Sequence, residues 1–199
     1  VSREIFSLAP PPRTRKDMAL EDRGQALFGT GFRQRAYYWL MNATLLSAFD
    51  MSDARMGEYA AAIASKKARI LYGYASAIHR LALYLLACPS HPEFRLRGVI
   101  CTAEALTETM RSDIEAAFCA PCFSQYGCND AGVSAFECEH KRGFHLITTR
   151  CYPEVLEGGR FIATDLLNDA FFLPRYDTGD LVERLMGRKP ELRFQYIQE

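Results

Sequence analysis

Apolar residues along the chain follow helical spacing in some segments and form short runs in others. After Ser52 they recur every three or four residues, as on one face of an amphipathic helix, at Met56, Tyr59, Ala60 and Ile63. Ser52 is a residue type that caps helices, and Asp53 suits the positive end of the helix dipole. We therefore expect a helix that begins after Ser52. Further upstream we expect a helix to start near Asp17 and another to span residues 32–47, which are rich in aromatic residues and leucine.

Short apolar runs alternate with helical patterns in the middle of the chain. Strands are predicted at 69–72, 98–102 and 122–126, and helices between them at 75–87 and 108–118, the second capped by Thr107. Strands that alternate with helices of this length form a parallel sheet with right-handed crossovers, so the expected fold class is α/β. Ligands bind such sheets beyond the carboxyl ends of the strands.

The pattern changes after Val133. Short β-rich pieces separated by glycine turns follow at 144–151, 154–156 and 160–165. We expect a smaller, largely antiparallel β unit there, after the α/β core.

Composition and charge narrow the class of partner. Of the 199 residues, 49% are hydrophobic and 24% are charged, which is ordinary for a domain with a buried core. The 24 basic and 24 acidic residues cancel, which disfavours nucleic-acid binding through a broad contact with phosphates. A small anionic ligand held by local groups remains compatible with this balance.

Seven cysteines and the absence of a secretory pattern favour a reducing compartment. The longest apolar run, near residues 81–87, is too short to span a bilayer. We expect a cytoplasmic protein with no membrane partner.

The stretch F-S-Q-Y-G-C-N-D-A-G-V-S-A, residues 123–135, follows the third predicted strand and carries the strongest candidate chemistry. Tyr126 offers a flat ring to a nucleobase, and Gly127 and Gly132 let a ligand approach the backbone. Asn129 and Asp130 offer an amide and a carboxylate near a magnesium-bound phosphate. This predicts a nucleotide site, although the same residue types also make ordinary turns and Tyr126 also suits a core position.

Two motifs in this order resemble the adenylate-forming (acyl-activating) superfamily: Y-G-C-N-D-A-G at 126–132 and Y-D-T-G-D at 176–180. With T-A-E-A-L at 102–106 and the 45–86 segment, the chain is most similar to the phenylacetate–CoA ligase branch, which includes CapK-like proteins. The resemblance implies a large N-terminal adenylation domain over residues 1–187, with 188–199 as the beginning of a C-terminal domain. Family members are about twice this length.

The resemblance also implies an activity. Such enzymes join a carboxylic acid to ATP with Mg²⁺ to form an acyl-adenylate, release pyrophosphate, and pass the acyl group to a thiol. The acceptor is coenzyme A or the phosphopantetheine of a carrier protein, and a homodimer is left open. Aromatic residues around Tyr74 and Phe136 favour an aryl or arylacetic acid.

Carried onto this sequence, the resemblance gives most of the motif residues a role. Asn129 and Asp130 stand where most members have a threonine near the α-phosphate and a magnesium-binding glutamate, and are the expected catalytic pair. Asp180 would take the ribose hydroxyls, and Arg188 would lie at the hinge to the C-terminal domain. The nucleotide would further contact Thr102, Ala103, Glu104, Ala105, Tyr126, Gly127 and Cys128. The acid would contact Tyr74, Ala131 and Gly132.

Departures from the family pattern support an alternative. Asp130 is one methylene shorter than glutamate, and Asn129 lacks a hydroxyl. Only Gly29-Thr30-Gly31 stands where members carry a longer phosphate loop. A non-catalytic CapK-like homologue in polysaccharide or natural-product biosynthesis is therefore the second hypothesis. A dinucleotide-binding oxidoreductase is disfavoured, because no G-x-G-x-x-G follows a strand.

Five residues raise the question of a zinc site: Cys128, Cys138, His140, His145 and Cys151. They include no C-x-x-C pair and match no common zinc spacing, so scattered thiols and surface histidines are favoured, and zinc at Cys138 and His145 stays open.

Overall fold

A computed structural model describes residues 17–21, 43–48, 50–88, 90 and 92–183, with side chains from residue 43 onward. The chain divides into two compact units, Val1–Cys122 and Phe123–Glu199, which are described separately. The predicted boundary at 187/188, Arg188 and Gly29-Thr30-Gly31 lie outside the described residues, so these assignments stay predictions. Within the described ranges, no helix combines the length and apolarity needed to cross a bilayer.

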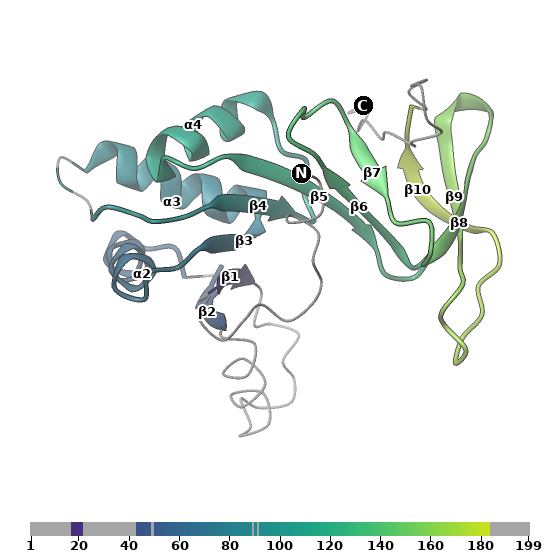
Figure 1. Ribbon diagram of the computed structural model, residues 1–199, viewed down its shortest axis with the longest axis horizontal. Helices are drawn as coiled ribbons and strands as arrows, with labels where there is room; N and C mark the ends of the chain where they lie inside the picture. Colours follow the sequence, from purple (N-terminus) through teal and green to yellow (C-terminus); the bar gives the residue numbers. More distant parts are fainter. Residues whose placement is uncertain (1–16, 22–42, 49, 89, 91, 184–199) are drawn as a thin grey trace. The chain divides into compact units, whose positions relative to one another are not determined.

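The first unit is built on a parallel sheet with the strand order β2-β1-β3-β4 (Figure 1). Its strands are β1 (Asp17–Glu21), β2 (Ala43–Ser47), β3 (Ile70–Tyr74) and β4 (Gly98–Thr102). All three pairings are parallel; for example, Leu71 of β3 lies opposite Val99 of β4. Because the strands are parallel, the carboxyl ends of β3 and β4 meet at one edge, where the first unit's predicted site residues begin.

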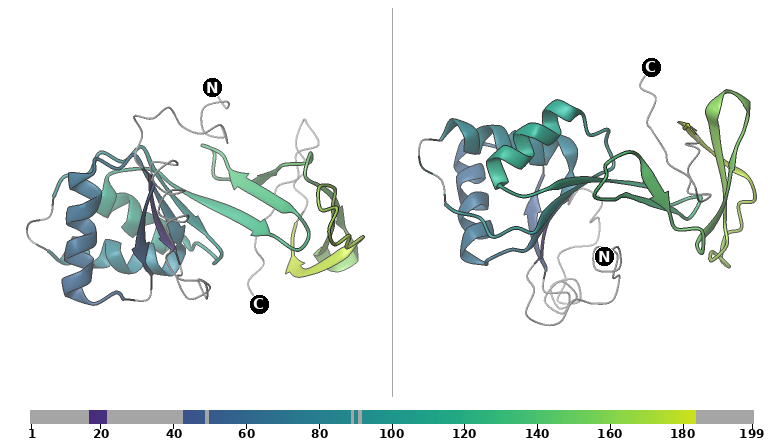
Figure 2. Two further views of the ribbon diagram at one scale, coloured as in Figure 1. Left: turned by 90° about the horizontal axis from the view of Figure 1, so that it is seen from below. Right: turned by 45° about the horizontal axis from the view of Figure 1, so that its top comes forward.

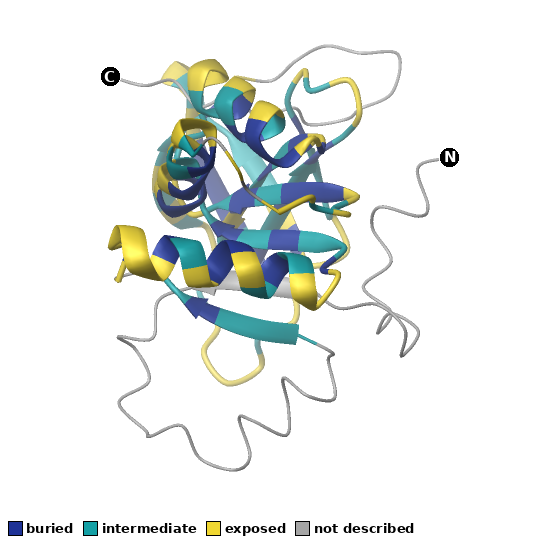
Figure 3. Ribbon diagram, turned by 90° about the vertical axis from the view of Figure 1, so that its left-hand side faces the viewer, coloured by how far each residue is buried: buried dark blue, intermediate teal, exposed yellow. Residues whose placement is uncertain are grey.

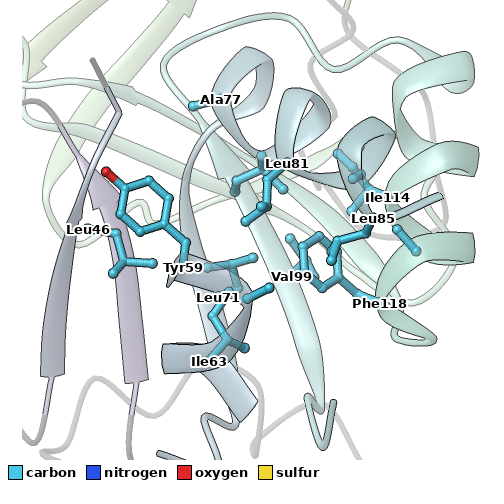
Figure 4. Packing of buried hydrophobic residues seen from close by; sticks show 14 of the residues in the cluster. Leu46, Tyr59, Ile63, Leu71, Ala77, Leu81, Leu85, Val99, Ile114 and Phe118 are labelled. Atoms are coloured by element: carbon cyan, nitrogen blue, oxygen red, sulfur yellow. The ribbon is translucent and has the colours of Figure 1, made fainter. Parts of the chain in front are cut away.

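Three helices cover one face of this sheet: α2 (Asp53–Ser65), α3 (Ala75–Ala87) and α4 (Glu108–Phe118) (Figures 1 and 2). Each has buried residues on its inner side and exposed residues on its outer side (Figure 3). The core between helices and sheet is largely aliphatic, with Tyr59 and Phe118 as its buried aromatic residues (Figure 4). Its fully buried members include Ile63, Leu71, Leu81 and Val99. The predicted α/β class is confirmed, as are the helices at 75–87 and 108–118.

Two upstream predictions are wrong. Residues Asp17–Glu21 form β1 instead of starting a helix, and Ala43–Ser47 form β2 instead of ending one. β1 pairs with β2 on one side and β3 on the other, so the sheet supplies hydrogen-bond partners that outweigh the helix propensity of Asp-Met-Ala-Leu-Glu. The rest of the predicted 32–47 helix lies outside the described residues.

The two predicted helix caps differ. Thr107 caps α4 as expected, because its side-chain oxygen accepts a hydrogen bond from the Met110 backbone N–H at 3.2 Å. Ser52 stands at the N-cap position of α2 but makes no cap hydrogen bond. Its hydroxyl instead donates to Asp50 Oδ1 at 3.0 Å, so the predicted position is right and the predicted bond is wrong.

In the second unit, the strands from Val133 onward pair antiparallel, as predicted, and β5 (Cys122–Cys128) also pairs antiparallel with β6 (Val133–Glu137). β5, β6 and β7 (Phe144–Leu146) form one set of strands. β8 (Cys151–Val155), β9 (Arg160–Asp165) and β10 (Tyr176–Leu181) form a three-stranded sheet with the order β10-β9-β8, and the short turn η1 (Glu157–Gly159) joins β8 to β9. Its core is small and includes Tyr126, Val133, Phe144 and Phe161.

Candidate nucleotide site

The predicted site residues fall into two groups, one in each unit. The first unit carries the 102–105 loop, which follows β4, and Tyr74 at the end of β3. The second unit carries the 126–132 loop, which spans the end of β5 and the turn into β6, and the Y-D-T-G-D motif on β10. Each group has its own internal geometry.

In the first unit, a carboxylate fastens the 102–105 loop to a helix. Glu104 accepts hydrogen bonds from the Ser76 backbone N–H at 2.7 Å and from the Ser76 hydroxyl at 3.0 Å. Ser76 lies in the first turn of α3, where unsatisfied N–H groups and the helix dipole favour negative charge. Ala103 has a φ of 64°, so the loop turns sharply directly after β4. Glu104 therefore sets the position of the loop that was predicted to contact the nucleotide.

In the second unit, Tyr126 is joined to Asp180. The Tyr126 hydroxyl donates to Asp180 Oδ2 at 2.5 Å, although the two residues are 54 positions apart. The ring is only 5% exposed and packs edge-on to Phe161, with the centroids 6.2 Å apart. Burial, followed by the neighbouring Asp180 carboxylate, raises the pKa of the Tyr126 phenol above its usual value. The phenol is therefore protonated, and the hydrogen bond runs from tyrosine to carboxylate.

The turn on β10 that carries Asp180 is held by its own hydrogen bonds. The Thr178 hydroxyl donates to the Phe161 carbonyl at 2.9 Å and accepts from the Asp180 backbone N–H at 3.2 Å. Gly179, at a φ of 78°, lies where the register between β9 and β10 shifts. This irregularity belongs to the motif, since the left-handed angle at Gly179 is one that glycine adopts without strain.

In a second tyrosine–aspartate pair, the tyrosine comes from the Y-D-T-G-D motif and the aspartate from the 126–132 loop. The Tyr176 hydroxyl, on β10, donates to Asp130 Oδ2 in the 126–132 loop at 3.3 Å. The Asp130 charge is the largest cause of a raised pKa at Tyr176. Each motif therefore contributes one tyrosine and one aspartate, and each tyrosine contacts the aspartate of the other motif. We call these two contacts the crossed pairs.

The predicted acyl-pocket residues Ala131 and Gly132 lie in the tight turn before β6. Ala131 is fully buried, and Gly132 has a φ of 64°. A Cβ at Gly132 would lie 2.6 Å from Oδ2 of Asp165, a buried carboxylate that also accepts a hydrogen bond from the Leu167 backbone N–H at 2.8 Å. The turn therefore packs directly on Asp165 at the end of β9, and this contact requires glycine.

The structure thus brings together Tyr126 with Asp180 and Asp130 with Tyr176. Asn129 and Gly127 are exposed, and Cys128 is half-buried, so these three present part of their surface to solvent. Reasoning from the sequence missed three partners, Ser76, Tyr176 and Asp165. Only Tyr176 carried a signal, as the first residue of Y-D-T-G-D. The other two contacts depend on tertiary packing.

The residues present fit a magnesium ion only in part. Asp130 is an exposed carboxylate, and Mg²⁺ in nucleotide sites commonly takes one or two carboxylates plus phosphate oxygens and water. Among the described residues no three histidine, cysteine, aspartate or glutamate side chains are grouped to hold a metal by themselves. The five residues considered for a zinc site, Cys128, Cys138, His140, His145 and Cys151, are among the residues to which this applies.

Solved structures with the same fold include a CoA ligase with a bound adenylate. A 2-hydroxyisobutyryl-CoA ligase in an open conformation, solved with 2-HIB-AMP and CoA, matches over 84% of this chain and 40% of its own, with a TM-score of 0.62 and 16% identity. VinN, solved with L-aspartate, matches over 90% of this chain and 49% of its own, with a TM-score of 0.60 and 14% identity. The chain thus has the fold of the N-terminal domain of adenylate-forming enzymes, which confirms the resemblance at the level of fold.

Among curated proteins, the sequence is similar to Protein CapK of Staphylococcus aureus. The two are 29% identical over 74% of this chain and 37% of CapK. No protein-family model matches the chain. The chain spans less than half the length of each of these three relatives.

Proposed function

We propose that the protein activates a carboxylic acid with ATP, forming an acyl-adenylate and pyrophosphate, and then passes the acyl group to a thiol. One observation carries the proposal. Two motifs that are each expected to contact the nucleotide are joined through Tyr126 and Asp180, which are 54 positions apart, in a chain with the adenylate-forming fold. The solved relative with 2-HIB-AMP and CoA supports an acyl-adenylate and a thiol acceptor for proteins of this fold.

The chemistry asks the protein mainly for positioning and charge neutralisation. Attack of a carboxylate oxygen on the α-phosphorus, with pyrophosphate leaving in line, needs little covalent help. In this proposal Asp180 accepts hydrogen bonds from the ribose hydroxyls, and Asn129 donates an amide N–H to the α-phosphate. Asp130 would hold Mg²⁺, directly or through water, and the ion would supply charge neutralisation for the phosphates. Arg188 lies at the hinge to a C-terminal domain.

The remaining assignments concern the base and the acid. Residues 102–105, Tyr126, Gly127 and Cys128 surround the base, while Tyr74, Ala131 and Gly132 border the acid. The solved relatives hold unlike ligands, 2-HIB-AMP in one and L-aspartate in the other, so the fold alone does not select the substrate. Tyr74 and Phe136 support an aryl or arylacetic acid. Coenzyme A or a carrier-protein phosphopantetheine is the proposed acceptor, in a cytoplasmic protein that acts as a monomer or homodimer.

Pyrophosphate release tests the proposal. The full-length protein, mixed with Mg-ATP and a panel of aliphatic, amino, aryl and arylacetic acids, is expected to release pyrophosphate with at least one of them. Asp180→Ala is expected to abolish most of this release, because it removes the acceptor for the ribose hydroxyls. If no acid elicits pyrophosphate and ATP does not raise the unfolding temperature of the wild type, the proposal is wrong.

The second candidate is a non-catalytic CapK-like homologue, favoured by the similarity to CapK and by Asn129 and Asp130 in place of threonine and glutamate. It predicts no pyrophosphate release with any acid. A double substitution that restores the threonine and glutamate of most family members distinguishes the two candidate functions. Asn129→Thr combined with Asp130→Glu is expected to maintain or increase release from an active enzyme, and to leave a non-catalytic homologue silent.

A further inference from the structure

In both crossed pairs the tyrosine contacts the same one of the two carboxylate oxygens. Tyr126 contacts Oδ2 of Asp180, and Tyr176 contacts Oδ2 of Asp130. Within the described residues, Oδ1 of both aspartates accepts no hydrogen bond. Each carboxylate is thus held at one oxygen and left with the other for a ligand, which suits a carboxylate that must meet a ligand in one orientation.

The Tyr126 contact is the more constraining of the two. A phenol bound to a carboxylate at 2.5 Å is a charge-assisted hydrogen bond, stronger than one between neutral groups. Its donor sits on a ring fixed in the core against Phe161, while Asp180 is half-buried on a turn held by Thr178. A rigid donor fixes the rotation of the carboxylate, whereas water in its place would not.

We infer that Tyr126 acts on the nucleotide through its hydroxyl, as a positioning residue that orients Asp180 for the ribose. Tyr176 orients Asp130 in the same way for the phosphate and metal side. The inference rests on the proposed function, and it adds a role for Tyr126 beyond contact of its ring with a base.

Discrimination of the ribose tests the inference. The dissociation constants of ATP and 2′,3′-dideoxy-ATP are measured by calorimetry with Mg²⁺ for the full-length wild type and for Tyr126→Phe, which keeps the ring and removes the hydroxyl. ATP is expected to bind Tyr126→Phe about tenfold more weakly, the loss typical of one hydrogen bond to a charged group. Dideoxy-ATP is expected to bind as before. The ratio of the two constants should therefore shrink about tenfold, an effect that a merely structural role would not produce.

Three further comparisons give the test its controls. Tyr152→Phe removes the hydroxyl of a tyrosine on β8 that is 62% exposed, and should leave both constants unchanged. In an Asp180→Ala background, Tyr126→Phe should change ATP affinity less than twofold, because a group that acts through Asp180 has nothing left to orient. Tyr176→Phe should raise the Mg²⁺ concentration needed for half-maximal ATP binding and leave the ribose ratio as it is.

The outcomes separate this inference from the proposed function. A wild type that binds ATP and prefers it to dideoxy-ATP, with the same ratio in Tyr126→Phe, overturns the inference alone. Additive effects of Tyr126→Phe and Asp180→Ala do the same. A wild type that binds neither nucleotide overturns the proposed function and this inference with it.

Discussion

The two strand-end loops predicted to meet the nucleotide are anchored in different ways. The 102–105 loop of the first unit is held by Glu104, an exposed side chain, on the exposed Ser76 at the start of α3. The 126–132 loop of the second unit is held by the buried Tyr126 and by Gly132, which packs on the buried Asp165. One motif lies on top of a core that other residues build. The other motif is part of the core.

This difference has a consequence for how each motif tolerates change. The first unit's core draws on three helices and includes Ile63, Leu81 and Phe118, none of which belongs to the 102–105 loop. The second unit's core is smaller and includes Tyr126 and Ala131 from the motif itself. Substitutions in the second loop should therefore lower stability and binding together, and substitutions in the first should lower binding with little loss of stability.

The largest effect is expected at Gly132. In Gly132→Ala the new Cβ would lie 2.6 Å from Asp165 Oδ2, on a residue already at a left-handed φ, so Asp165 or the turn must move. Overpacking and the left-handed angle together should lower the free energy of unfolding by about 2–4 kcal/mol. Denaturant unfolding followed by circular dichroism measures this loss.

Gly158→Ala is the matched control for that loss. Gly158 also has a left-handed φ, 77°, but nothing lies within 4 Å of the position that a Cβ would take there, so only the backbone cost of about 1–2 kcal/mol remains. Equal losses in the two variants would show that Asp165 yields easily, and the contrast between the two loops would then weaken.

An intermediate loss of stability is expected at Thr107, which follows the 102–105 loop and caps α4. Thr107→Ala removes the acceptor of the Met110 backbone N–H and should cost about 1 kcal/mol of unfolding free energy. Ser52→Ala is the matched control, because Ser52 occupies the N-cap position of α2 without a cap hydrogen bond. If Ser52→Ala cost as much as Thr107→Ala, the cap bond would not be the cause of the loss.

The helices that the sequence predicted well are those whose apolar spacing is strong. Met56, Tyr59, Ala60 and Ile63 are the buried residues of α2, as their periodicity indicated. The wrong predictions concern segments in which the spacing of apolar residues does not distinguish a helix from a strand. Ala-Thr-Leu-Leu-Ser at 43–47 is too short to separate a strand from a buried helix segment, and its state depends on pairing with β1.

The candidate site, too, was predictable from the sequence only in part. Residue types and motif order predicted which segments carry Tyr126, Asp130 and Asp180, and their roles stay predictions. The pairing of each tyrosine with the aspartate of the other motif could not be predicted, because it depends on where β10 lies in the second unit. The contact of Gly132 with Asp165 likewise joins a turn to the end of β9, 33 positions away in sequence.

The smallest loss of stability is expected at Glu104, where the contrast between the loops is sharpest. Glu104→Gln keeps a hydrogen-bond acceptor but removes the charge that faces the first turn of α3, and the site is exposed, so unfolding free energy should fall by only about 0.5 kcal/mol. ATP affinity should fall several-fold, because the 102–105 loop loses its charged anchor. Ser76→Ala, which removes only the hydroxyl contact and leaves the backbone one, should weaken ATP binding less than Glu104→Gln. Parallel losses of stability and affinity at Glu104, of the size expected at Gly132, would show that the first loop is as much a part of its core as the second.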